Sequence, residues 1–186
     1  MVRIGMAQRH PGITPALRAF IEAQKVFFVG TATADGRVNV SPKGLDGLRV
    51  TGEHTVHWLN FTGSGNETAA HVIENPRMTL MFCAFEGKPQ ILRLYGVARS
   101  IGPGSSEWEA SLTRFIPSPG ARQIFELSVD LVVTSCGMGV PLYTYQGQRP
   151  GLVEWAERKG RDGIIEYQRR KNHTSLDGKP TDITGE

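Results

Sequence analysis

A run of small polar residues before a predicted helix has the composition of an anion site. The stretch "LNFTGSGNETAAHVIENP", residues 59–76, begins like a strand, turns through Gly63 and Gly65, and continues as a helix. The first amides of a helix lack intrahelical partners and carry a partial positive charge, so they bind phosphate readily. The two glycines would let an anion approach the backbone. Further donors would come from the side chains of Thr62, Ser64, Asn66 and Thr68.

A structural interpretation of the same segment is also open. Ser64 stands three residues before Glu67, which is the spacing of a capping box. In that motif the Ser64 side chain would accept from the amide of residue 67, and Glu67 would reach back. The Glu67 carboxylate disfavours a bare anion site unless it points away or takes the capping role. The segment therefore predicts a capped helix, a phosphate site, or both.

Lys43 is a second candidate, in the segment "RVNVSPKG" at residues 37–44. Pro42 cannot donate to a strand ladder, so we expect pairing to be interrupted there and Lys43 to project from a fixed backbone. Gly44 leaves space beside it. A cation in this position suits an anionic or electron-rich ligand, although an ordinary lysine at a strand end is the alternative.

Arg93 is a third candidate, because it lies within the otherwise apolar strand segment "QILRLYG" at residues 90–96. A desolvated charge without a partner is costly, so this guanidinium needs one. The partner is an acidic side chain, an anionic ligand, or solvent on an exposed strand face.

The remaining residue types argue against several other classes of protein. The five histidines are scattered, no Cys or His pair has the spacing of metal ligands, and no Ser–His–Asp or Cys–His set stands out. Two cysteines do not make a disulfide framework. The net charge is +3, and acids interleave with the basic residues near the C-terminus, unlike a nucleic-acid-binding stripe. No apolar run reaches the ~20 residues of a membrane span or forms a secretory signal, so we expect a cytoplasmic location.

Short strands joined by tight turns must position these candidates. Several joins are too short for a parallel crossover, so the pattern favours an antiparallel barrel or sandwich with added helices. We expect strands at 25–33, 38–42, 48–52, 55–61, 77–85, 90–101 and 121–136, and helices at 14–24, 66–75, 105–115, 152–160 and 162–172. Thr14 is the expected cap of the first helix and Pro15 its first residue. Residues 1–140 would form the barrel, and residues 141–186 a helical extension and polar tail packing on it or on a partner.

Three segments, in this order, resemble the pyridoxamine 5'-phosphate oxidase-like family of flavin-binding split-barrel proteins. They are "FVGTATADGRVNVSPKG", "WLNFTGSGNETAAHVIENPRMTLMFCAF" and "ILRLYGVA", and the match runs from about residue 20 to about residue 135. The resemblance implies a mainly β fold, a six-stranded antiparallel split barrel with peripheral helices. It also implies a homodimer that holds FMN at the interface, one per subunit.

The resemblance further implies which residues contact FMN. The strand with "VSPK" would run beside the isoalloxazine ring and place near it Asn39, Val40, Ser41 and Lys43. The segment "TGSGNET" and the preceding strand would lie near the ribityl chain and phosphate, through Asn60, Thr62, Ser64, Gly65, Asn66 and Thr68. Arg93 would be a further phosphate partner.

Two departures separate the chain from the oxidases proper. Asn66 and Glu67 stand where those enzymes place a basic pair, and their C-terminal arginine–histidine segment has no clear counterpart here. We therefore expect a flavin-dependent oxidoreductase that acts on another small substrate, with NADH or NADPH as a candidate electron donor. Candidates for the substrate pocket wall are Tyr143, Tyr145, Arg149 and Trp155, and the alternative is that they pack the C-terminal helices onto the barrel. Two alternatives stay open: a flavin store or sensor without turnover, and a split barrel that binds another cofactor, such as a deazaflavin or haem, or that has lost its ligand.

Overall fold

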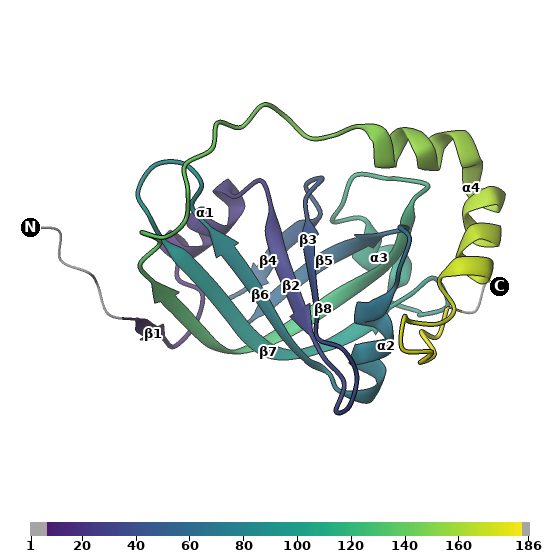
Figure 1. Ribbon diagram of the computed structural model, residues 1–186, viewed down its shortest axis with the longest axis horizontal. Coiled ribbons are helices and arrows are strands. Elements are labelled where there is room, and N and C mark those ends of the chain that lie inside the picture. Colours follow the sequence, from purple (N-terminus) through teal and green to yellow (C-terminus); the bar gives the residue numbers. More distant parts are fainter. Residues whose placement is uncertain (1–6, 184–186) are drawn as a thin grey trace, which may run out of the picture.

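The computed structural model describes residues 7–183 and confirms a mainly antiparallel β fold with peripheral helices (Figure 1). Its strands are β1 (Gln8–His10), β2 (Phe27–Thr31), β3 (Asn39–Lys43), β4 (Leu48–Gly52), β5 (Thr55–Phe61), β6 (Arg77–Cys83), β7 (Ile91–Ile101) and β8 (Ala121–Ser135). Its helices are α1 (Pro15–Ala23), α2 (Glu67–Glu74), α3 (Trp108–Leu112) and α4 (Gly151–Lys171).

All strands join one sheet in the order β3-β2-β6-β7-β8-β5-β4, and β1 pairs with β8. The two edge strands, β3 and β4, do not pair with each other, so the barrel stays open along one side. Lys43 crosses this opening, since its Nζ donates to Asn60 Oδ1 on β5 at 3.3 Å. The sheet has eight strands within residues 7–183 where the resemblance implied six. One cause is the 15-residue length of β8, which pairs with β7 along one edge and with both β5 and β1 along the other.

The barrel interior is filled by alternating apolar side chains, as the pattern of β7 predicted. Leu92 and Leu94 are fully buried, and Arg93 between them faces the other side of the sheet. Trp58 stacks on Phe125 with ring centroids 4.7 Å apart. A second cluster lies under α3 and consists of Leu59, Ile101, Trp108, Phe115 and Ile124. This second cluster packs the end of β5 against the start of β8.

Local sequence signals succeeded at one helix and failed at one strand. Thr14 caps α1 as expected, because its Oγ1 accepts from the amide of Leu17 at 3.3 Å and Pro15 is the first helical residue. The expected break in pairing at Pro42 is wrong, since Pro42 stands opposite Phe28 in register and the ladder continues to Lys43. The physical reason is that β3 is an edge strand, where a missing backbone donor costs no ladder bond.

The C-terminal segment returns along the barrel and packs beside α2. Residues 136–150 run from the end of β8 across the molecule to α4, whose far end lies next to α2 (Figure 1). The two predicted helices are joined across a kink at Gly160, which has φ 66°. The predicted boundary at residues 140 and 141 falls in the connecting segment, and residues 1–6 and 184–186 lie outside the described range. No helix among residues 7–183 is long and apolar enough to cross a membrane.

Candidate functional site

The loop before α2 does not form the expected capping box. Asn66 is the N-cap of α2, no side chain caps the helix, and Glu67 is its first residue. Both carboxylate oxygens of Glu67 accept from the amide of Leu176, each at 3.0 Å. The capping-box prediction is therefore wrong. The Glu67 carboxylate binds the amide of a distant residue, and the helix begins two residues later than a cap at Ser64 requires.

The backbone amides of residues 64–68 have no hydrogen-bond acceptor within the described chain. A Cβ at Gly63 would have nothing within 4 Å, and one at Gly65 would meet only the Glu67 carboxylate at 3.4 Å. Neither glycine has a positive φ, so the backbone conformation does not require them. The loop thus presents several unpaired N–H groups at a helix N-terminus with clear space in front of its glycines, which suits an anion.

A chain of polar contacts links this loop to β3. Lys43 donates to Asn60 Oδ1, and Asn60 Nδ2 donates to Asn66 Oδ1 at 3.4 Å. Asn66 is 2 % exposed, and its own Nδ2 has no partner among residues 7–183. Asn39 Nδ2 donates to Thr68 Oγ1 at 3.4 Å and Ser41 Oγ donates to Asn39 Oδ1 at 3.1 Å. These two chains of contacts form a network around the N-terminus of α2 that contains six of the eleven predicted cofactor residues.

Lys43 is a cation without a counter-ion in this network. Its Nζ lies 5.4 Å from the centroid of the Trp58 ring, and it forms no ion pair with a carboxylate in the described range. Burial, aided by the nearby positive charge of Arg122, lowers the pKa of Lys43 to about 8. The charge of an anionic ligand would oppose this lowering of the Lys43 pKa, since it would favour the protonated ammonium.

Arg122, which the sequence did not single out, supports the loop before α2 by binding one of its carbonyls. It is 4 % exposed, and its Nη1 donates to Gly65 O at 3.0 Å and to Asn172 Oδ1 at 2.7 Å. Burial lowers the pKa of Arg122 to about 10. The signal that singled out Arg93, an arginine inside an apolar strand, also applies to Arg122 at the start of "ARQIFEL" and could have found it.

The C-terminal end of α4 fixes the carbonyl side of the same loop. Asn172 Nδ2 donates to Gly63 O at 3.0 Å, and Gln168 Nε2 donates to Thr62 Oγ1 at 2.7 Å. The Thr62 hydroxyl donates in turn to Gly120 O at 3.0 Å. Thr62 is thus engaged inside the protomer, and the carbonyls of Gly63 and Gly65 are both bound by buried side chains.

Other predicted residues are not joined to this network within one chain. Arg93 lies on the outer face of β7, where its Nη1 donates to Ser135 Oγ at 3.3 Å. The Val40 side chain is 63 % exposed on β3. The expected pocket-wall aromatics pack locally, Tyr143 on Phe85 and Trp155 on Tyr167, with centroids 5.4 and 5.0 Å apart. Among residues 7–183, no three or more His, Cys, Asp or Glu side chains gather as a metal site.

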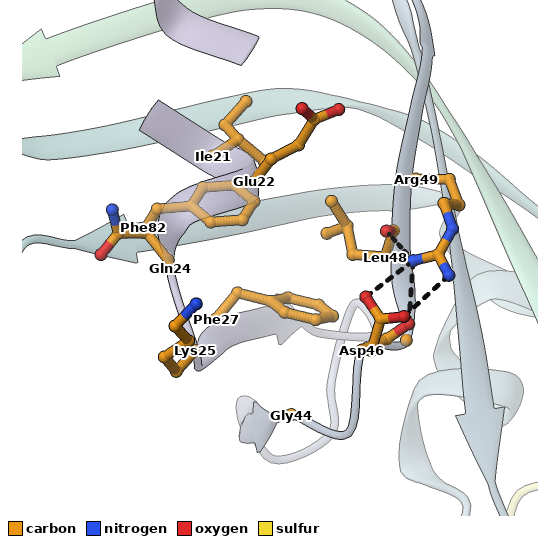
Figure 2. Close-up of a pocket in the computed structure, with 11 residues that line it drawn as sticks. Ile21, Glu22, Gln24, Lys25, Phe27, Gly44, Asp46, Leu48, Arg49 and Phe82 are labelled. Carbon is orange, nitrogen blue, oxygen red and sulfur yellow. Dashed lines mark hydrogen bonds and ion pairs between the residues drawn. The ribbon is translucent and has the colours of Figure 1, made fainter. Parts of the chain in front are cut away.

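A separate hollow of about 320 Å³ lies between α1 and residues 44–49, which form the turn before β4 and the start of that strand (Figure 2). Figure 2 shows the rings of Phe27 and Phe82 on one side of it and Arg49 bound to Asp46 on the other. Arg49 is already paired there, with Nη2 to Asp46 Oδ2 at 2.9 Å. This hollow contains none of the predicted cofactor residues and no unpaired buried polar side chain of the described chain.

Comparison with known proteins adds independent evidence. The family model for pyridoxamine 5'-phosphate oxidase matches residues 13–136. The pyridoxamine 5'-phosphate oxidase family protein ustO of Aspergillus flavus is 35% identical over 189 residues, which cover 92% of this chain and 76% of that protein.

Two solved structures share the fold at low identity. HupZ of Group A Streptococcus superposes with a TM-score of 0.52 at 20% identity, covering 64% of this chain and 91% of that chain. A candidate pyridoxamine 5'-phosphate oxidase from Lactobacillus delbrueckii superposes with a TM-score of 0.52 at 17% identity, covering 66% and 94%. The matched residues include the whole network around α2, from β3 to Arg122 on β8, except its C-terminal supports. This chain therefore belongs to the pyridoxamine 5'-phosphate oxidase family.

Proposed function

We propose that this protein binds FMN through the α2 loop and β3, as a homodimer, and uses it in the oxidoreduction of a small molecule. The observation that carries the proposal is the set of unpaired amides at residues 64–68, next to a lysine without a counter-ion. The phosphate would accept from these amides and from the Ser64 hydroxyl. The buried Nδ2 of Asn66, which has no partner in the described chain, would gain an acceptor from the ligand.

The residues present fit a phosphate despite the acid at the start of α2. Glu67 is turned to the amide of Leu176, so its carboxylate has a donor of its own and does not compete for the loop amides. Gly63 and Gly65 add no Cβ in front of them. The helix N-terminus contributes its partial positive charge. Fewer formal charges oppose the phosphate than in a site built on arginines, so we expect moderate affinity.

The ring would lie along β3, beside Asn39, Val40, Ser41 and Lys43. Val40 offers an exposed apolar side chain to an aromatic surface, and the polar side chains around it offer donors to the ring edge. The Lys43 ammonium would hold negative charge on the bound ligand. FMN, when bound, supplies hydride and single-electron transfer.

A second copy of the chain would complete the site. Exposed apolar side chains lie on or beside β3, namely Val38 at 74 % and Val40 at 63 % exposure, and Val97 on β7 is 48 % exposed. Burying them against a partner is favourable. Arg93, on the outer face of the sheet, would then reach the phosphate of the neighbouring subunit rather than its own.

The absorption spectrum of the purified protein tests this proposal. We expect yellow protein absorbing near about 450 nm, with the released chromophore identified as FMN by mass. A protein that is colourless and takes up no added FMN, or that releases a deazaflavin or haem, would overturn the FMN proposal. Reduction by NADH or NADPH and reoxidation by a small substrate support an enzyme; bound flavin that no nicotinamide reduces contradicts the oxidoreductase part and favours a flavin store.

A further inference from the structure

A second cavity, of about 700 Å³, lies where α2, α3 and α4 meet the ends of β7 and β8. Figure 1 shows these helices gathered at one end of the barrel. The residues proposed to contact FMN do not line it. The cavity therefore has a lining of its own, and Arg122, which belongs to that lining, also donates to Gly65 O in the loop before α2.

Two buried polar groups that line this cavity lack partners within the described chain. Arg122 and Gln123 are each 4 % exposed, and the Nε of Arg122 and the Oε1 of Gln123 make no hydrogen bond. The Gln123 amide is oriented by its other end, since Nε2 donates to Ser100 Oγ at 3.2 Å. One cationic donor and one carbonyl acceptor are thus left unpaired, and buried groups of this kind normally have partners.

Apolar and polar residues share the rest of the lining. Trp108 is 7 % exposed and Ile164 is 2 % exposed, and Leu112 lies beside them. Arg161 adds a second guanidinium, and Glu109 and Asp182 add carboxylates. A guanidinium binds a carboxylate well, an amide oxygen needs a donor, and the apolar wall needs a hydrocarbon body.

We propose that this cavity binds a small apolar carboxylic acid with a hydrogen-bond donor on the carbon next to the carboxylate. The carboxylate pairs with Arg122, the donor meets Gln123 Oε1, and the side chain packs on Trp108 and Ile164. A free apolar amino acid and the matching 2-hydroxy acid share this chemistry. The inference does not depend on FMN binding, because it uses a different space; the one residue that it shares with the proposed FMN site is Arg122, which also supports the loop before α2.

Calorimetric titration of the full-length purified protein tests the ligand class. The probes are L-leucine, 2-hydroxy-4-methylpentanoate, 4-methylpentanoate, which lacks the donor, and 3-methylbutylamine, which lacks the carboxylate. We expect at least one of the first two to bind, the third to bind about tenfold more weakly, and the amine not to bind. Preference for leucine over the hydroxy acid would assign the donor as an ammonium. No heat with either of the first two, or equal binding of the amine, would overturn the proposal.

A matched pair of variants on α3 tests the location. Leu112→Trp places a large ring in the cavity, whereas Ala110→Trp adds the same ring at an exposed position of α3 outside the lining. We expect Leu112→Trp to lose binding of the carboxylate that the natural chain binds, and Ala110→Trp to keep it, with both circular dichroism spectra unchanged. If Leu112→Trp does not fold, Gln123→Glu takes its place, because a carboxylate there repels the ligand with little change in shape. Ligand binding that survives in folded Leu112→Trp or in folded Gln123→Glu contradicts the site.

Discussion

Asn172 and Arg122 are joined by a hydrogen bond of 2.7 Å between Asn172 Oδ1 and Arg122 Nη1, although they lie 50 positions apart. Asn172 is fully buried, and its Nδ2 donates to the carbonyl of Gly63, while Arg122 donates to the carbonyl of Gly65. The two glycine carbonyls before α2 are thus held by one connected pair of side chains. The C-terminal segment is therefore a structural part of the loop that we propose to bind phosphate.

Replacing Asn172 should weaken both the fold and the loop. Asn172→Ala leaves the buried Arg122 guanidinium and the Gly63 carbonyl short of a partner, so we expect the free energy of unfolding to fall by about 1–3 kcal/mol. We also expect weaker FMN binding, since the loop loses a support. Urea denaturation and FMN titration measure the two effects. Lys171→Ala, at an exposed neighbouring position, is the control; equal stability of the two variants would contradict this role of Asn172.

A negative charge at position 64 should repel the phosphate. Ser64 is exposed and makes no side-chain hydrogen bond within residues 7–183, so Ser64→Asp should leave the fold and the dimer intact. We expect the Kd for FMN to rise by at least ~10-fold, whereas Ser64→Asn, which adds no charge, should change it little. Flavin fluorescence quenching gives both constants. Unchanged affinity in the aspartate variant would refute the phosphate position.

Removing the charge of Glu67 should have the opposite effect. Its carboxylate lies in the first turn of α2, and both oxygens accept from the amide of Leu176. Glu67→Gln keeps one acceptor for that amide and removes a negative charge near the phosphate, so we expect FMN to bind ~2–5-fold more tightly. The gain should shrink at high salt, because screening weakens the same repulsion. Weaker binding in Glu67→Gln would argue that the phosphate lies elsewhere.

Lys43 should give the protein a distinct pH dependence. Its pKa is lowered from the ordinary 10.5 to about 8, so between these values the unfolded chain binds more protons than the folded one. The stability of the FMN-free protein should therefore rise with pH from about 8 upward. Arg122, with a pKa lowered to about 10, adds a rise of the same sign at the upper end.

FMN binding should show the reverse trend. An anionic ligand favours protonated Lys43, so its affinity should fall as pH rises through about 8. Lys43→Met should remove both the rise in stability and the fall in FMN affinity that begin near pH 8. Titrations between pH 7.5 and 9.5, where the phosphate remains a dianion, measure this. A natural chain and a Lys43→Met variant with parallel profiles would show that Lys43 does not titrate with the ligand.

Local patterns predicted much of this fold but little of what supports the site. Strand alternation gave the two faces of β7, and Thr14-Pro15 gave the start of α1, because these signals lie within a few residues. The capping box failed because Glu67 is taken up by Leu176, 109 positions away. No local sequence pattern predicts a contact between residues so far apart in the chain.

The residues proposed to bind the phosphate were easier to predict from the sequence than the residues that hold their loop in place. Ser64, Gly65 and Asn66 stand in one motif, so sequence alone picked them out. Arg122 and Asn172 are single residues on distant elements, and only the folded chain brings them under the loop. Their roles follow from burial and unpaired atoms, which composition and spacing do not reveal.

The ratio of the dissociation constants of FMN and riboflavin for the purified, flavin-free protein tests the central claim most directly. The two ligands share the ring and the ribityl chain and differ only in the phosphate. If the amides of residues 64–68 hold that phosphate, FMN should bind at least ~100-fold more tightly than riboflavin at neutral pH. Equal affinities for the two ligands, or no binding of FMN, would contradict the account.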